Sequence, residues 1–147
     1  MTRARRPVDL TATTGGRRLL FTGLYFCEGA PIGFLWWALP SVLRSRGVDT
    51  AVIGALLGWL VLPWALKWVW APLVDRVRTQ RFGLRAWITA AQLGMAASLV
   101  PLLLVDPLED FDRLATALVF HAVFASTQDA AIDALMIRVT PAGSADA

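Results

Sequence analysis

Residues 51–74 read AVIGALLGWLVLPWALKWVWAPLV, an apolar run of 24 residues that contains a single charge, Lys67. At a rise of about 1.5 Å per residue, a helix of this length covers the roughly 30 Å of a bilayer's hydrocarbon core. A helix on the surface of a soluble protein would carry a polar stripe, which this run lacks. We therefore expect residues 51–74 to cross a membrane as a helix.

Three further apolar windows lie around this one, at residues 19–43, 86–105 and 114–137. The four windows hold 93 of the 147 residues but only four of the 25 charged ones. Charged residues make up 17% of the chain, against about 25% in soluble proteins. The pattern predicts an all-α membrane protein with four transmembrane helices over residues 19–137, and it excludes a soluble enzyme.

The arginines predict the orientation of the chain. Ten of the thirteen lie in the N-terminal segment 1–18, in the loop 75–85 and in the tail 138–147, whereas the loops 44–50 and 106–113 hold three. Because positive residues stay on the cytoplasmic side, we expect both termini in the cytoplasm of a multi-pass inner (plasma) membrane protein. The basic residues then orient the chain in the lipid bilayer, and no nucleic-acid partner is expected.

Four ionisable side chains interrupt the apolar windows: Glu28, Lys67, Asp129 and Asp133. Each costs up to about 2.5–3.5 kcal/mol near the centre of an inserted helix. Selection for stability alone would not favour them.

The depths of these residues agree. Glu28 lies about 15 Å above the cytoplasmic end of its helix, Lys67 about 12 Å and Asp129 about 13 Å, when residues are counted at 1.5 Å each. With the orientation above, we expect one polar cluster across the first, second and fourth helices. Lys67 would be the countercharge to one or two carboxylates.

Asp129 and Asp133 are spaced i,i+4 and so share one helix face. Two carboxylates on a desolvated face resist being charged together, so such a pair can carry a proton; Gln128 adds an amide beside them. The alternative is that these groups only lock the helices together. His121 lies closer to the outer side, and a packed, hydrogen-bonded histidine is favoured over a proton relay.

Two pairs of glycines, Gly29 with Gly33 and Gly54 with Gly58, form small-xxx-small patterns that let helix backbones approach closely. They indicate packing without identifying the partner. The sequence contains no zinc-ligand spacing, phosphate loop or nucleophile elbow, so we expect no catalytic residue, metal or cofactor.

Three stretches resemble the AmpG-type muropeptide permeases of the major facilitator superfamily. LYFCEGAPIG at 24–33, with ALP at 38–40, looks like their first helix, LKWVWAPLVDR at 66–76 is similar to the end of their second, and ASTQDAAIDA at 125–134 resembles their fourth. Asp75 and Arg76 take the place of the superfamily's gate motif between helices two and three. The following residues 81–85 are poorer in Gly and Arg than is usual there.

The resemblance implies a proton-driven importer of cell-wall muropeptides, or a related solute such as acetyl-CoA, and not an enzyme. Glu28, Lys67, Gln128, Asp129 and Asp133 would be its proton-coupling or substrate-facing residues. The partners would be protons and a small glycopeptide-like substrate. The implied fold has two six-helix halves, with helices one and four along the cavity and helix three peripheral.

This chain contains four such helices, so we expect a truncated chain that works with the missing helices of a full transporter or by self-association. Two alternatives stand beside it. One is an intramembrane aspartate-rich transferase, in which Asp129 and Asp133 would bind a Mg²⁺-diphosphate. The other is a complete four-helix transporter that acts as a dimer.

Overall fold

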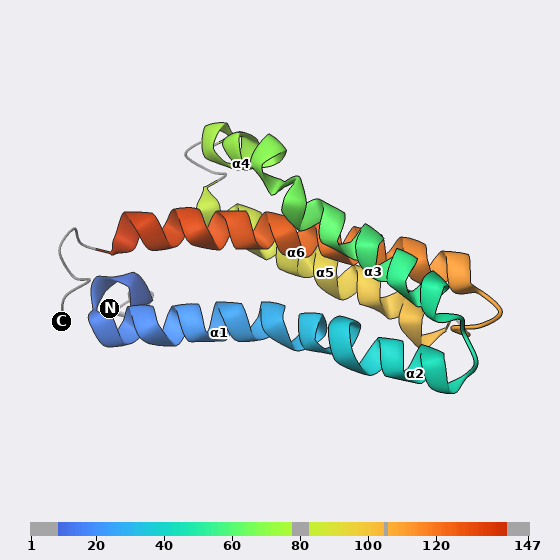
Figure 1. Cartoon of the computed structure of the whole chain (residues 1–147). Coiled ribbons are helices and arrows are strands. Elements are labelled where there is room, and N and C mark those ends of the chain that lie inside the picture. Colours follow the sequence, from blue (N-terminus) through green and yellow to red (C-terminus); the bar gives the residue numbers. More distant parts are fainter. Residues whose placement is uncertain (1–8, 78–82, 105, 141–147) are drawn as a thin grey trace.

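The computed structural model describes residues 9–77, 83–104 and 106–140, with the exception of the side chain at position 75. Among these residues the chain forms helices and no strands, as Figure 1 shows. Three helical stretches are long and apolar enough to cross a membrane: Thr14–Ser45, Thr50–Val74 and Leu84–Leu103. With a further long helix near the C-terminus, this confirms the expected all-α membrane protein.

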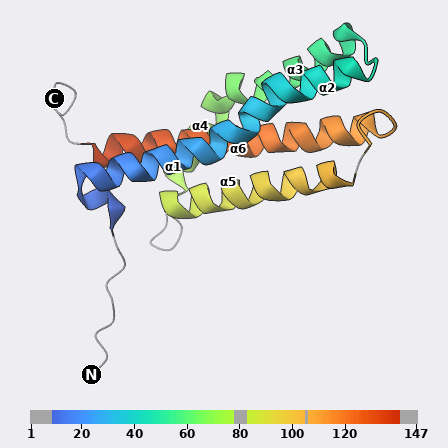
Figure 2. The same ribbon diagram turned by 90° about the horizontal axis from the view of Figure 1, so that it is seen from below.

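The first stretch consists of α1 (Thr14–Gly33), a π-helical turn (Phe34–Ala38) and α2 (Leu39–Ser45). A short 3₁₀ turn (Leu10–Ala12) precedes it, so helical structure begins inside the segment expected to be only a basic tail. Pro31 lies within α1 and cannot donate a backbone hydrogen bond. The stretch changes direction at the π-helical turn that follows (Figure 2).

The second stretch is interrupted as well. α3 (Thr50–Ala65) ends and α4 (Lys67–Arg76) begins on either side of Leu66, where the N–H of Val69 bonds to the carbonyl of Leu66 as in a 3₁₀ turn. Pro63 lies three residues earlier and removes one more helical donor. As a result α4 turns away from the line of α3 (Figure 1).

The third and fourth helices form an antiparallel pair. α5 (Leu84–Leu99) continues into a 3₁₀ turn (Val100–Leu103), and α6 (Phe111–Val139) returns beside it (Figure 2). α6 contacts α1, α3, α4 and α5, which makes it the central helix. It falls outside the three most apolar stretches because polar residues such as His121, Gln128 and Asp129 lower its mean hydropathy.

Two apolar clusters hold the helices together. One joins α2 and α3 to the first half of α6, and it includes Leu43, Leu60 and Leu118. The other joins α1, α4 and α5 to the last part of α6, and it includes Val74 and Ile132. Gln128 and Asp129 lie between the two clusters along α6, whereas Asp133 lies within the part of α6 that contributes to the second cluster.

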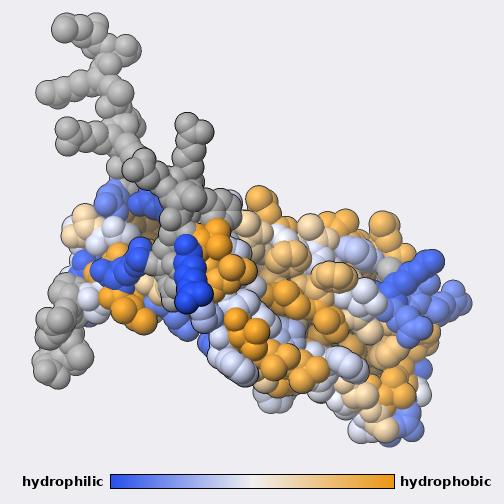
Figure 3. Space-filling view, turned by 90° about the horizontal axis from the view of Figure 1, so that it is seen from above, coloured by the Kyte–Doolittle hydropathy of each residue, from blue (hydrophilic) through white to orange (hydrophobic). Residues whose placement is uncertain are grey.

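The surface has the pattern of a membrane protein. Apolar side chains cover the middle of the face in Figure 3, and hydrophilic ones gather toward its ends. Large apolar side chains are widely exposed, among them Trp37, Trp59 and Leu103.

Candidate functional site

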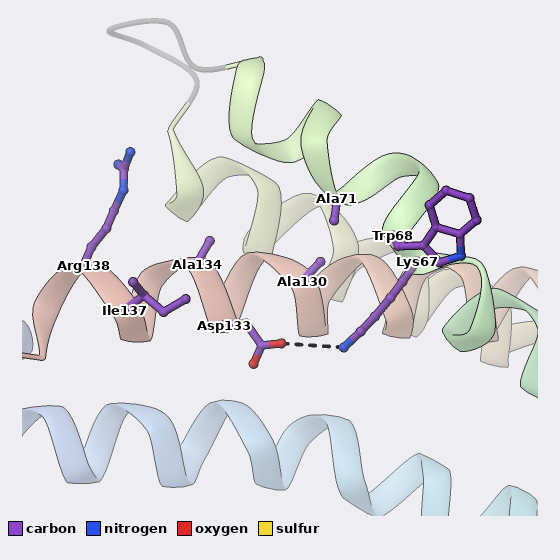
Figure 4. A pocket seen from close by; sticks show the side chains of 8 residues that line it. All are labelled: Lys67, Trp68, Ala71, Ala130, Asp133, Ala134, Ile137 and Arg138. Carbon is purple, nitrogen blue, oxygen red and sulfur yellow. Dashed lines mark ion pairs between the residues drawn. The ribbon is translucent and has the colours of Figure 1, made fainter. Parts of the chain in front are cut away.

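The candidate site is an ion-pair cluster between α4 and α6. Lys67 is the first residue of α4, directly after the interruption at Leu66. Its Nζ lies 2.6 Å from Oδ2 of Asp129 and 3.6 Å from Oδ2 of Asp133. The i,i+4 spacing places both carboxylates on the α6 face that meets α4. One ammonium group therefore bridges two carboxylates, and Figure 4 shows its contact with Asp133.

A third helix contributes a hydrogen bond. The phenol of Tyr25, on α1, donates to Oδ1 of Asp133 at 3.2 Å. Tyr25 was not among the residues predicted from the sequence, although it stands three residues before Glu28 and so on a neighbouring part of the same helix face. Helices α1, α4 and α6 thus meet at this cluster; the α1 residue that bonds to Asp133 is Tyr25, whereas the depths in the sequence had pointed to Glu28.

The cluster is partly open. The side chain of Asp129 is 18% exposed, that of Lys67 37% and that of Asp133 48%. A pocket of about 550 Å³ lies next to it, and its walls come from α4 and the last turns of α6 (Figure 4). The pocket is lined by Lys67, Trp68, Ala71, Ala130, Asp133, Ala134, Ile137 and Arg138.

The charges of the cluster do not cancel. One ammonium faces two carboxylates, and Glu28 on α1 lies within electrostatic range of all three groups. Glu28 itself is buried, and its Oε2 has no hydrogen-bond partner among the described residues. If all four groups are ionised, the cluster carries a net charge of −2. Bound protons or a cationic group of a solute would neutralise this excess.

Gln128 does not join the cluster. It is fully buried, and it lines a different cavity with residues of α1 and α5. Because consecutive residues of a helix are rotated by about 100°, Gln128 and Asp129 point toward different neighbours although they lie at one depth.

His121 is buried against α5. Its Nδ1 lies 3.2 Å from Oγ of Ser98 and 3.3 Å from the carbonyl oxygen of Met95. This geometry matches the packed, hydrogen-bonded histidine that the sequence analysis favoured.

The expected gate motif lies at the end of α4. Arg76 is exposed there, whereas the side chain of Asp75 and the loop 78–82 lie outside the described residues. In the part of the chain that the structure describes, no three His, Cys, Asp or Glu side chains come together as a metal-ligand group.

Comparison with known proteins finds one matching family model and several relatives. A family model described as acetyl-coenzyme A transporter 1 matches residues 18–109. An uncharacterised protein of Haemophilus influenzae is 36% identical over 115 residues, which cover 78% of this chain and 26% of that protein. The anhydromuropeptide permease of Escherichia coli K12 is 27% identical over 122 residues, which cover 81% of this chain and 24% of the permease.

A membrane protein of Saccharomyces cerevisiae is 31% identical over 71 residues, which cover 47% of this chain and 13% of the yeast protein. No solved structure matches the chain. The chain spans about a quarter of the length of the two bacterial relatives.

Proposed function

Since the chain belongs to the acetyl-coenzyme A transporter 1 family, which includes the AmpG-type permeases, we propose that its helices form part of the path of a proton-coupled importer. The observation that carries the proposal is the bridge from Lys67 to Asp129 and Asp133 inside the membrane-crossing region. Ionisable groups at such depths are expensive and mark ion or substrate pathways.

The surplus of negative charge supports proton coupling. Lys67 neutralises at most one carboxylate at a time, and the second is neutral only with a proton or a cationic partner. A group that binds and releases a proton as its exposure changes can link solute movement to a proton gradient. Asp133, which is about half exposed beside the pocket, is placed to exchange that proton with water.

The proposed substrate is a muropeptide-like glycopeptide. The support is the name of one relative, the anhydromuropeptide permease, whereas the name of the family favours acetyl-CoA. The two solutes differ in charge and in hydrogen-bonding groups, so a direct comparison separates them.

The test uses liposomes whose membrane contains the protein with this sequence. The solution outside is acidic, and it holds labelled anhydromuropeptide or acetyl-CoA. We expect the gradient to accelerate anhydromuropeptide uptake, and a protonophore to abolish that acceleration. Faster uptake of acetyl-CoA would overturn the substrate but not the transport. Chemical conversion of a prenyl or phospho substrate that depends on Mg²⁺, without uptake, would overturn the transport and favour the transferase.

A further inference from the structure

A second cavity lies between α1, α5 and α6, away from the ion-pair cluster. Its volume is about 310 Å³. It is lined by Cys27, Pro31, Gln92, Met95, Ala96, Leu99, His121 and Gln128. Nothing in the proposed ion-pair mechanism uses it.

The α6 wall of this cavity carries buried polar atoms without hydrogen-bond partners among the described residues. Gln128 and His121 are both fully buried, and their spacing of seven residues places them on one helix face. Neither Oε1 nor Nε2 of Gln128 has a hydrogen-bond partner among the described residues, and the same is true of Nε2 of His121. Buried polar groups without partners are rare in native proteins, because each would lose its hydrogen bonds to water.

The other two walls add polar groups. Pro31 has no N–H, so the carbonyl of Cys27, four residues before it, lacks its usual helical donor. Gln92 brings a second amide from α5. Residues with polar groups from three helices therefore line one space, and its other lining residues are apolar.

We propose that this cavity binds a small cluster of ordered water molecules, which bridge the amide of Gln128 to Nε2 of His121 and to the carbonyl of Cys27. The volume suffices for several waters, since one molecule takes about 30 Å³ in the liquid. Water is the ligand that fits, because the carboxamide needs a donor and an acceptor at once. A metal cation would find no carboxylate among the lining residues, and an anion no cation.

The test uses Met95, which lines the cavity and is only 4% exposed. An X-ray pulse converts bound water into hydroxyl radicals, which oxidise the side chains next to that water. We expect Met95 to be oxidised in the intact chain in lipid nanodiscs. In the double variant Gln128→Leu, His121→Leu, oxidation should fall several-fold, whereas oxidation of Met136, outside the cavity, should not change.

The matched control is Thr127→Val, which removes a polar group from the neighbouring residue on α6. The hydroxyl of Thr127 bonds to the carbonyl of Val123 and does not line the cavity, so Met95 oxidation should stay at the wild-type rate. If Met95 is oxidised as slowly in the wild-type chain as in the double variant, the proposal is overturned.

The single variant Gln128→Leu supplies a second readout should the double variant fail to insert. With bridging water, loss of the amide leaves the other groups short of a partner, and the melting temperature falls. In a dry cavity the buried amide has no hydrogen-bond partner and destabilises the fold. Its replacement by an apolar side chain of similar size then raises the melting temperature. A raised melting temperature would therefore contradict the water cluster.

Discussion

Lys67 reaches two carboxylates because of its place in the chain. It is the first residue after the interruption at Leu66, where the second membrane-crossing stretch turns along α6. Its partners stand one helical turn apart, so one flexible ammonium group contacts both. Carboxylates therefore outnumber cations around Lys67.

The charge balance predicts the effect of Lys67→Met. The variant leaves two carboxylates facing each other, and loss of one partner of a buried ion pair costs about 3–5 kcal/mol. Because Lys67 is 37% exposed, we expect a smaller loss of about 1–3 kcal/mol in the free energy of unfolding. Adding Asp129→Asn should recover part of that loss, as measured by chemical unfolding in detergent micelles. A double variant less stable than Lys67→Met would contradict the charge argument.

Residue spacing predicted the height of the polar groups but not the direction in which each one points. Counting from the cytoplasmic ends brought Lys67 and Asp129 to one level, and the structure pairs them. The same counting could not show that Gln128 turns toward α5, nor that the phenol of Tyr25 reaches Asp133. Both depend on how each helix is rotated about its axis, which packing decides.

Among the elements, α6 organises the molecule. It contacts α1, α3, α4 and α5, and it takes part in both apolar clusters. The lengths of the apolar windows predicted the helices themselves. The interruptions at Phe34–Ala38 and at Leu66 were not predicted, because prolines inside membrane helices are often accommodated without a break.

The packing of α5 on α6 predicts the effect of Gly94→Val. A Cβ at Gly94 would lie 2.5 Å from the ring of Phe124, so a side chain there pushes the two helices apart. We expect a loss of about 1–3 kcal/mol, the usual cost of overpacking.

Gly58→Val is the matched control, since a Cβ at Gly58 meets nothing within 4 Å. Thermal unfolding of both variants tests this prediction. Equal melting temperatures would contradict a close contact between Gly94 and Phe124. The small-xxx-small patterns had pointed to Gly29, Gly33, Gly54 and Gly58, yet none has a close neighbour in this chain.

The loop between α5 and α6 predicts a pH dependence. The backbone N–H groups of Leu108 and Glu109, followed by the charge of Arg46, hold the pKa of Asp106 below its ordinary 3.8. A lowered pKa means that these contacts are complete above the ordinary value and are lost as the pH falls through the lowered one. The NMR amide signal of Leu108 should therefore titrate with a midpoint below 3.8. Asp106→Asn should abolish the titration, and a midpoint above 3.8 would contradict the contacts.

At the scale of the whole molecule, the sequence predicted the class of protein. Apolar windows of membrane length predicted an all-α membrane protein, and the described helices confirm it. The helix that carries Asp129 and Asp133, α6, is also the one with most neighbours among the described helices, although Asp133 stays about half exposed. What surrounds the exposed side of the Lys67 cluster could not be predicted, because this chain spans only about a quarter of its bacterial relatives.

The proposal that the carboxylates paired with Lys67 carry the transported proton can be tested on a single variant. Asp129→Asn is compared with the wild-type protein in liposomes, once for uptake driven by a proton gradient and once for exchange of labelled against unlabelled solute without a gradient. We expect the variant to lose gradient-driven uptake but to retain exchange, because the path stays intact while Lys67 then neutralises the one carboxylate left in the bridge, which no longer takes up a proton. Gradient-driven uptake at the wild-type rate would contradict it.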